Sequence, residues 1–220
     1  MSHSLINPTI LYWGTPVVLI TTVNEDGSYN IAPMSSAWWL GSSCMLGLLA
    51  LSQTTKNLIR TGQCVLNLPS DDLTDHVNAL ARTTGTSDVP DFKIMLGYSY
   101  VKDKFAAAKL HPQASEVVDP PRIQECPVQM EARVSQVHEF QSSTQSPEGG
   151  SLLKSIEVQV VRTYVTDDVR MVGHENRVDP DKWLPMIMSF QNLYGLRDRA
   201  GMTSKLAQID EKHYRMPVDE

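Results

Sequence analysis

The segment from residue 16 to residue 40 constrains the fold more than any other part of the chain. A run of β-prone residues, Val17–Val23, meets the turn sequence Asn24–Gly27, and a second strand-like run leads to Pro33. Asp-Gly between two such runs is a strong hairpin signal, because glycine readily adopts the positive φ that tight hairpin turns need. Proline has no amide hydrogen to donate, so we expect the chain to leave the strand ladder there. The sequence predicts an antiparallel strand pair whose exit, residues 33–37, presents accessible backbone amides.

Two tryptophans, Trp38 and Trp39, follow this exit directly. The exit could lie along the edge of a planar heterocycle, with either tryptophan as an apolar wall. The alternative places both tryptophans in the hydrophobic core, and for at least one of them we favour that interpretation.

Further strands and helices follow in an order typical of an antiparallel barrel. Apolar or alternating runs predict strands at residues 44–51, 64–69, 126–140 and 152–165. Cap residues and apolar spacing predict short helices at residues 52–62, 71–81 and 102–110. The strands are joined mostly by hairpins, with no βαβ rhythm, so we expect a mainly β fold with peripheral short helices.

Two segments lack a regular pattern. Residues 82–100 form a connection rich in Thr, Gly, Ser and Asp, and an excursion of this length is more often functional or a dimer contact than idle. The C-terminal arm, residues 171–220, holds a helical stretch near residues 205–209 and either contacts a partner subunit or is a frayed end. We expect one domain over residues 1–220, with its core at about residues 10–170.

Composition restricts the classes of function. The net charge of −6 and pI near 5.5, without a cluster of basic residues, argue against a nucleic-acid surface. Cys44, Cys64 and Cys126 lie in or beside apolar runs and form no CxxC pair, so we expect buried reduced thiols in a cytoplasmic protein. The N-terminus lacks the pattern of a signal peptide, and the apolar run at residues 44–51 is too short to cross a bilayer.

The most informative cluster of polar residues follows the predicted strand at residues 44–51. Residues 52–57 place hydroxyl groups, a lysine and free helix amides at one point, which suits an anion such as a phosphate monoester. The alternative is an ordinary N-cap with a solvated Lys56. The six histidines form no metal-binding pair and no GxSxG occurs, so the sequence predicts neither a metal site nor a catalytic side chain. If the chain is an enzyme, a cofactor carries its reaction.

These segments together resemble a known family. The stretch PVVLITTVNEDGSYNIAPMSSAWWL, then LSQTTKNLIRTGQCVLNLP, KDKFAAAKL and PPRIQECPVQMEARV, are similar in that order to the flavin reductase-like family, which has an FMN-binding split barrel. The resemblance covers roughly residues 16–168. It implies a six-stranded antiparallel Greek-key barrel, a homodimer with FMN near its interface, and electron transfer from NADH or NADPH through FMN.

The resemblance also implies a set of site residues. Four of them, Met34, Ser35, Ser36 and Ala37, would lie along the isoalloxazine ring. Around the ribityl phosphate the family pattern places Ser52, Thr54, Thr55, Lys56 and Asn57. Asn30 is interpreted as a residue that fixes the loop rather than one that contacts the flavin. No side-chain acid, base or metal is implied.

Three functions remain open from the sequence. The first is an NAD(P)H:FMN oxidoreductase that supplies reduced flavin to free solution or to a monooxygenase. The second is a flavoredoxin-like electron carrier that retains FMN without efficient NAD(P)H oxidation. Many family members have a His-x-Asp near the end of the last long strand, whereas residues 163–168 of this chain contain no histidine. Because that histidine bears on the pyridine nucleotide, its absence favours the carrier. The third is a split barrel that binds another ligand. Lys109 is a further departure, because a glycine is common there.

Overall fold

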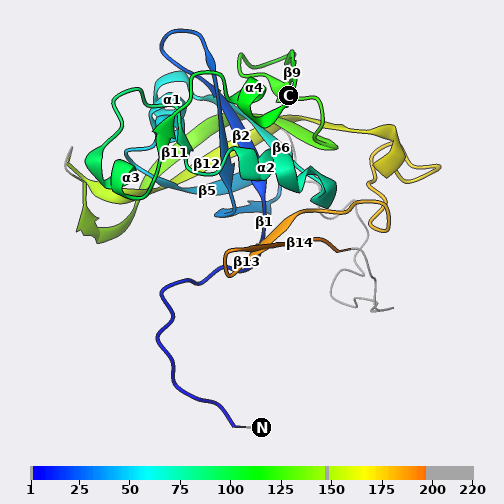
Figure 1. Ribbon diagram of the computed structural model, residues 1–220. Coiled ribbons are helices and arrows are strands. Elements are labelled where there is room, and N and C mark those ends of the chain that lie inside the picture. The colour runs from blue at the N-terminus through cyan, green and yellow to red at the C-terminus, as the bar shows by residue number, and fades with distance from the viewer. Residues whose placement is uncertain (1, 147–148, 197–220) are drawn as a thin grey trace.

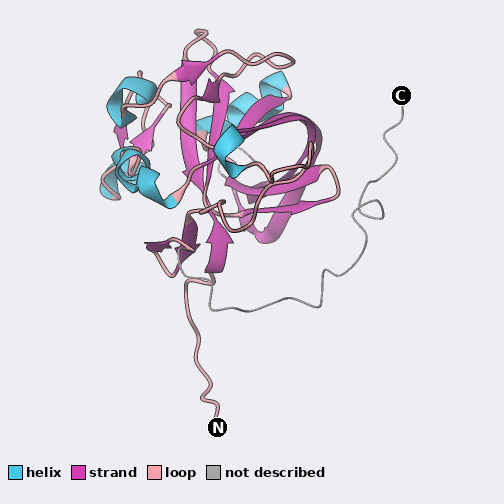
Figure 2. Ribbon diagram, turned by 90° about the vertical axis from the view of Figure 1, so that its right-hand side faces the viewer, coloured by secondary structure: helices cyan, strands magenta, loops and turns pink. Residues whose placement is uncertain are grey.

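The computed structural model describes residues 2–146 and 149–196. A seven-stranded antiparallel sheet forms its centre and curls into an open barrel (Figure 1 and Figure 2). The strand order is β3-β2-β6-β11-β12-β5-β4. In chain order the strands are β2 (Val18–Val23), β3 (Tyr29–Met34), β4 (Ala37–Leu40), β5 (Ser43–Leu49), β6 (Gln63–Leu68), β11 (Val128–Gln145) and β12 (Ser151–Val165). Each of the six predicted strands is present, and the short β4 adds a seventh.

Smaller elements surround this sheet. A three-stranded sheet joins β1 (Trp13–Pro16), β13 (Ile187–Ser189) and β14 (Asn192–Tyr194). Two further pairs are the parallel β7 (Thr83–Thr84) and β8 (Ser99–Tyr100), and the antiparallel β9 (Pro112–Gln113) and β10 (Arg122–Ile123). The helices are α1 (Gln53–Thr61), α2 (Thr74–Ala79), α3 (Asp91–Met95) and α4 (Lys104–Ala108), with 3-10 turns at Asp71–Leu73 and Asp167–Val169.

Strand β2 lies between two hydrophobic cores, which explains its uninterrupted apolar sequence. Val18 and Ile20 pack into the core inside the barrel, together with Leu58 of α1. Leu19, on the opposite face, packs into a second core with Leu80 and Phe105 of the peripheral helical layer. Successive side chains of a strand point to opposite faces, so both faces need apolar residues here.

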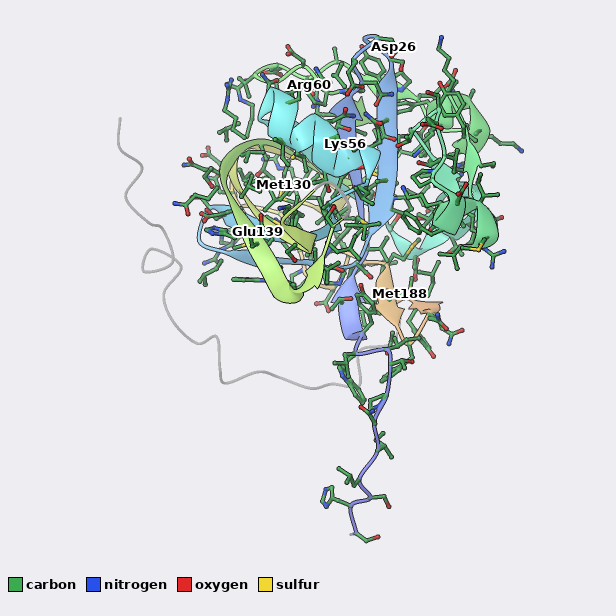
Figure 3. All side chains as sticks on the ribbon, turned by 90° about the vertical axis from the view of Figure 1, so that its left-hand side faces the viewer. Asp26, Lys56, Arg60, Met130, Glu139 and Met188 are labelled. Carbon is green, nitrogen blue, oxygen red and sulfur yellow. The ribbon has the colours of Figure 1, made fainter. Side chains whose placement is uncertain are left out.

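Helix α1 begins and ends where the sequence predicts. The hydroxyl of Ser52 accepts a hydrogen bond from the amide of Thr55 at 3.1 Å, and Gly62 ends the helix at a φ of 68°. Glycine suits this left-handed position because it has no Cβ to clash. Figure 3 shows Lys56 and Arg60 on this helix, which lies over the curled sheet. None of the helices in the described part of the chain is long and apolar enough to cross a membrane.

The expectation that the chain leaves the ladder at Pro33 is wrong by one residue. Strand β3 continues through Met34, and Pro33 pairs with Leu19 of β2. Because β3 is the first strand in the sheet order, it has a neighbour on only one side. Proline is tolerated at such an edge, where its missing amide hydrogen interrupts no second ladder.

The helix predicted at residues 71–81 is shorter than expected and begins as a 3-10 turn. The helical turn predicted at residues 102–110 is confirmed as α4, and its C-cap residue, Lys109, has a φ of 53°. This left-handed conformation gives a physical reason for glycine being common at that position. The predicted helical stretch at residues 205–209 lies outside the described residues.

Of the two tryptophans, Trp39 is partly buried against the barrel core, whereas Trp38 is 55% exposed. The three cysteines are buried and free, as predicted. Burial raises the pKa of the Cys44 thiol to about 12, so this thiol is un-ionised near neutral pH.

Candidate functional site

A cavity of about 770 Å³ opens between the barrel and the segment at residues 80–98. Six parts of the chain line it: β3, the end of β5, the start of α1, the segment 80–98, Lys104 at the start of α4, and the β13–β14 hairpin. Its volume is in the range of small-molecule sites. The irregular segment, for which we expected a functional or dimer-contact role, therefore supplies part of the lining.

The N-terminal turn of α1 forms part of the cavity lining. Ser52, Gln53 and Thr54 all line the cavity. The first residues of a helix have no intrahelical acceptor for their amides, and the Thr55 amide is already bonded to the Ser52 hydroxyl. The amides of Gln53 and Thr54 therefore provide a partial positive charge at the cavity wall.

Buried polar side chains hold this helix in place. Thr55 donates from its hydroxyl to the carbonyl oxygen of Leu49 at 2.8 Å. The amide group of Asn57 donates to the Thr22 hydroxyl at 2.9 Å and to Asn24 Oδ1 at 2.8 Å. Both residues are fully buried and neither lines the cavity: Thr55 anchors α1 to the end of β5, and Asn57 anchors it to the first hairpin.

Asn30 and Gly85 lie in close contact in the cavity lining. Asn30 is 1% exposed and donates to the Thr54 hydroxyl at 3.0 Å, but its Oδ1 has no hydrogen-bond partner. A Cβ on Gly85 would lie 2.6 Å from this oxygen, so only glycine fits. Buried polar atoms are nearly always satisfied, and an unpaired acceptor at a cavity wall indicates a ligand that donates a hydrogen bond.

Two buried lysines line the same cavity. Lys104 is 3% exposed, and its ammonium donates to the carbonyl oxygen of Ile31 at 2.9 Å. Burial, with repulsion from Lys93, lowers the pKa of Lys104 to about 8. Lys93 of α3 is 7% exposed, and burial with repulsion from Lys56 also lowers its pKa. Within the described residues no carboxylate lies within 4 Å of either ammonium group.

The β13–β14 hairpin closes another side of the cavity. Its turn places Phe190 and Gln191 at φ values of 45° and 68°, which is unfavourable for residues with side chains. Phe190 packs edge-on against Trp13 at 4.4 Å between ring centroids, and Gln191 lines the cavity with Met188. Figure 3 shows Met188 on β13, away from α1 in that view. Strain of this kind concentrates at functional sites.

The exit from β3 is tied to the neighbouring strand β5. The Gly47 amide donates to the carbonyl oxygen of Ser36 at 2.8 Å, and the hydroxyls of Ser36 and Tyr12 lie 2.8 Å apart. A Cβ on Gly47 would lie 3.1 Å from the Ser36 Cβ. Ala37 begins β4 and is buried. The exit from β3 is therefore packed against β5 and Tyr12, and its backbone has little conformational freedom.

The structure brings three of the nine sequence-predicted site residues to the cavity surface: Met34, Ser52 and Thr54. The other six are not among its lining residues: Ser35, Ser36, Ala37, Thr55, Lys56 and Asn57. Sequence reasoning missed Lys93, Gly85 and Gln191, and it interpreted Asn30 as a loop residue only. Lys104 lies in the KDKF segment that carried the resemblance, which was a signal for its importance. No cluster of metal-binding side chains occurs in the described part of the chain.

Comparison with known families shows which family this chain belongs to. The family model described as flavin reductase like domain matches residues 12–171. The chain belongs to the flavin reductase-like family. This confirms the family that the sequence motifs indicated. One relative in this comparison is the Bacillus subtilis protein YdfE, described as uncharacterized, which is 38% identical over 198 residues, or 90% of this chain and 91% of that protein.

Solved structures share the fold of this flavin reductase-like chain. Flavoredoxin of Desulfovibrio vulgaris matches with a TM-score of 0.72 at 20% identity, covering 94% of this chain and 99% of that one. Nitrilotriacetate monooxygenase component B from Bacillus cereus matches at 0.70 and 19%, covering 92% and 100%. The 2-nitrobenzoate 2-nitroreductase NbaA of Pseudomonas fluorescens matches at 0.67 and 20%, covering 89% and 86%. These likenesses confirm the split-barrel fold.

Proposed function

We propose that this chain binds FMN in the cavity and acts as an NAD(P)H-dependent flavin reductase. The electrons would pass to an acceptor such as free flavin or a partner monooxygenase. The flavin reductase-like family supports oxidoreductase chemistry, and the names of the structural neighbours include a monooxygenase component and a nitroreductase.

One observation carries the choice of a phosphate-bearing ligand. The cavity is lined by cationic side chains and helix amides, and no acidic residue is among its lining residues. Buried lysines without carboxylate partners are costly unless an anion compensates them. The unpaired Oδ1 of Asn30 additionally requires a donor, and the ribityl hydroxyl groups of FMN are donors. The residues present therefore fit FMN.

The roles of the individual side chains follow from their positions. Lys104 and the amides of Gln53 and Thr54 would hold the phosphate, and Asn30 would accept from the ribityl chain. Met34 of β3 would provide an apolar surface, and Gln191 of the β13–β14 hairpin would provide a polar group in the cavity lining. When bound, FMN supplies hydride and one-electron transfer that no side chain of this site can perform.

A visible absorbance spectrum tests this proposal. We expect the absorbance bands of FMN to shift when the protein binds it, with saturation at one FMN per chain. Anaerobic addition of NADH or NADPH should then bleach these bands. A protein that neither changes the FMN spectrum nor accelerates NAD(P)H oxidation in its presence would refute the proposal.

An electron carrier is the second candidate, because the end of β12 offers no histidine. Tyr164 occupies this region and stacks under the Arg122 guanidinium at 3.9 Å. Retention of FMN through gel filtration with negligible NAD(P)H turnover favours the carrier. FMN exchange with rapid turnover favours the reductase.

We also propose a cytoplasmic homodimer. Trp38 and Leu40 are 55% and 75% exposed on β4, the last strand in the sheet order, and such apolar edges are usually covered. The three free thiols suit a reducing compartment. Light scattering on the wild type and on Leu40→Glu measures the oligomeric state, and a monomeric wild type would contradict the dimer.

A further inference from the structure

The β13–β14 hairpin lines the cavity but belongs to a sheet of its own. It joins β1 in a three-stranded sheet that is separate from the seven-stranded one. Figure 1 shows this small sheet at the edge of the molecule, below the barrel in that view. Two residues of the hairpin, Met188 and Gln191, line the cavity. A movement of the hairpin would therefore change access to the cavity without disturbing the barrel.

The base of the hairpin is fixed, whereas its tip is held by exposed contacts. At the base, the Val17 amide donates to the carbonyl oxygen of Met186 at 2.9 Å, and both residues are buried in the second core. Met188, nearer the tip, is only partly buried. At the tip, the Phe190 amide donates to the carbonyl oxygen of Tyr12 at 2.9 Å, and these two side chains are 39% and 38% exposed. Segments held by exposed hydrogen bonds and few buried contacts open locally at low cost.

The position of the hairpin in this structure, which we call closed, is costly to maintain. Phe190 and Gln191 form its turn at φ values of 45° and 68°, where two-residue turns normally have Asn and Gly. The hydroxyl oxygen of Thr15 on β1 is buried and has no hydrogen-bond partner among the described residues. Backbone strain and an unpaired buried hydroxyl both reduce the stability of the closed position. A ligand that contacts Met188 and Gln191 would offset these costs.

Tyr12 links the hairpin to the exit from β3. Its hydroxyl lies 2.8 Å from the Ser36 hydroxyl, and its carbonyl oxygen accepts the hydrogen bond from Phe190. The backbone of Ser36 is itself bonded to the Gly47 amide of β5, so it belongs to the fixed barrel. Tyr12 is not among the residues that line the cavity. Loss of the Tyr12–Ser36 hydrogen bond would therefore loosen the hairpin without removing a group that faces a ligand.

We propose that the β1–β13–β14 sheet is a gate over the flavin cavity and that the Tyr12–Ser36 hydrogen bond is its latch. The gate opens by rotation of the small sheet about its buried base, Val17 and Met186, and it then admits or releases the ligand. Contacts of the bound ligand with the hairpin return it to the closed position. Tyr12 is a positioning residue, because it acts through the hairpin. The identity of the ligand, FMN, rests on the proposed function, whereas the movement does not.

Stopped-flow fluorescence of FMN binding tests the gate. If FMN passes only while the gate is open, association and release both depend on the open fraction. We expect Tyr12→Phe to raise both rate constants about three- to tenfold, the range for one hydrogen bond, and to change the Kd by less than about twofold. A fixed wall predicts no change in either rate constant. Unchanged rates, or a rise in the release rate alone, would overturn the proposal.

Tyr100→Phe is the matched control, because Tyr100 is 41% exposed, close to the value for Tyr12, and does not line the cavity. It should bind and release FMN at the wild-type rates. Ser36→Ala removes the other half of the latch, so in that background Tyr12→Phe should have no further effect on the rates. Additive effects of the two substitutions would reject the latch.

Hydrogen exchange in the FMN-free protein separates this inference from the proposed function. We expect residues 187–194 to exchange about three- to tenfold faster in Tyr12→Phe than in the wild type. The β9–β10 pair is also short and does not line the cavity, so it should exchange equally in both proteins. If FMN does not bind, the proposed function fails, and faster exchange confined to residues 187–194 retains the gate. Equal exchange of this segment in the two proteins rejects it.

Discussion

The ammonium group of Lys104 donates a hydrogen bond to the carbonyl oxygen of Ile31 over 2.9 Å, at a position where the lysine is only 3% exposed. This contact ties helix α4 to strand β3 and brings a charge to the cavity wall. One neutral acceptor satisfies only one of the three ammonium donors. The arrangement is costly without a ligand and favourable with an anionic one.

Replacing Lys104 with methionine should therefore have opposite effects on stability and on binding. We expect Lys104→Met to raise the melting temperature of the FMN-free protein, because a buried charge is removed while the apolar stem is kept. FMN affinity should fall 10- to 100-fold, corresponding to a lost charged hydrogen bond of about 1.5–3 kcal/mol. Thermal unfolding and fluorescence titration measure the two effects. Lys102→Met is the control for both, and an unchanged FMN affinity in Lys104→Met would refute this role.

The lowered pKa of Lys104 predicts how stability depends on pH. Below about pH 8 this lysine is charged in the folded and the unfolded states, and the folded state bears the full cost of burial. Between about pH 8 and the ordinary value of 10.5, the unfolded chain binds the extra proton, so the stability of the FMN-free protein rises with pH. Urea unfolding of wild type and Lys104→Met at pH 7.5 and 9.5 isolates this contribution. Equal pH dependence in both proteins would contradict it.

The affinity for FMN should change with pH in the opposite direction. An anionic phosphate favours the protonated ammonium of Lys104, so we expect affinity to fall as pH rises above about 8. Fluorescence titration between pH 7 and 10 measures this change. The decline should be smaller in Lys104→Met, and an identical decline in both proteins would assign it to other groups.

The contact between Gly85 and Asn30 predicts a non-additive pair of substitutions. In Gly85→Ala the new Cβ would meet Asn30 Oδ1 at 2.6 Å, so we expect a loss of about 1–3 kcal/mol in stability from overpacking, with weaker FMN binding. In Asn30→Ala/Gly85→Ala the contact with Oδ1 is absent and only the Gln53 Cγ contact at 3.2 Å remains tight, so the added loss from Gly85→Ala should be smaller. Urea unfolding of the four proteins of this cycle measures the coupling. Additive effects would show that the close approach is unimportant.

Lys109 and Gln191 both have a positive φ, but only Gln191 lines the cavity, so their glycine variants separate an effect on stability from an effect on FMN binding. Lys109→Gly and Gln191→Gly both relieve unfavourable backbone conformations, and we expect each to raise stability by about 0.5–1 kcal/mol, the relief exceeding the entropy cost of glycine. Lys109 does not line the cavity, so its variant should bind FMN as the wild type does. Gln191→Gly should bind FMN several-fold more weakly, because Gln191 faces the cavity. Equal FMN affinities in the two variants would remove Gln191 from the site.

Local patterns in the sequence determined most of the fold. The caps Ser52 and Gly62 define α1, because a capping hydroxyl and a left-handed glycine act within one turn of the chain. The alternating and apolar runs define six strands, since side-chain periodicity reports which faces are buried. The ordered motifs also identified the family, and the end of β3 was misplaced by one residue because edge position is a property of the whole sheet.

Only the tertiary structure decided which side chains face the cavity. Asn30 lies in β3, Gly85 and Lys93 in the segment 80–98, and Lys104 in α4, and no local pattern relates them. Thr55 and Asn57 sit within the predicted anion motif, yet their hydrogen bonds to Leu49, Thr22 and Asn24 turn them into anchors of α1. The physical reason is that a helix presents neighbouring residues to different surroundings, and the packing of the hairpin against α1 selects which of them reach the ligand.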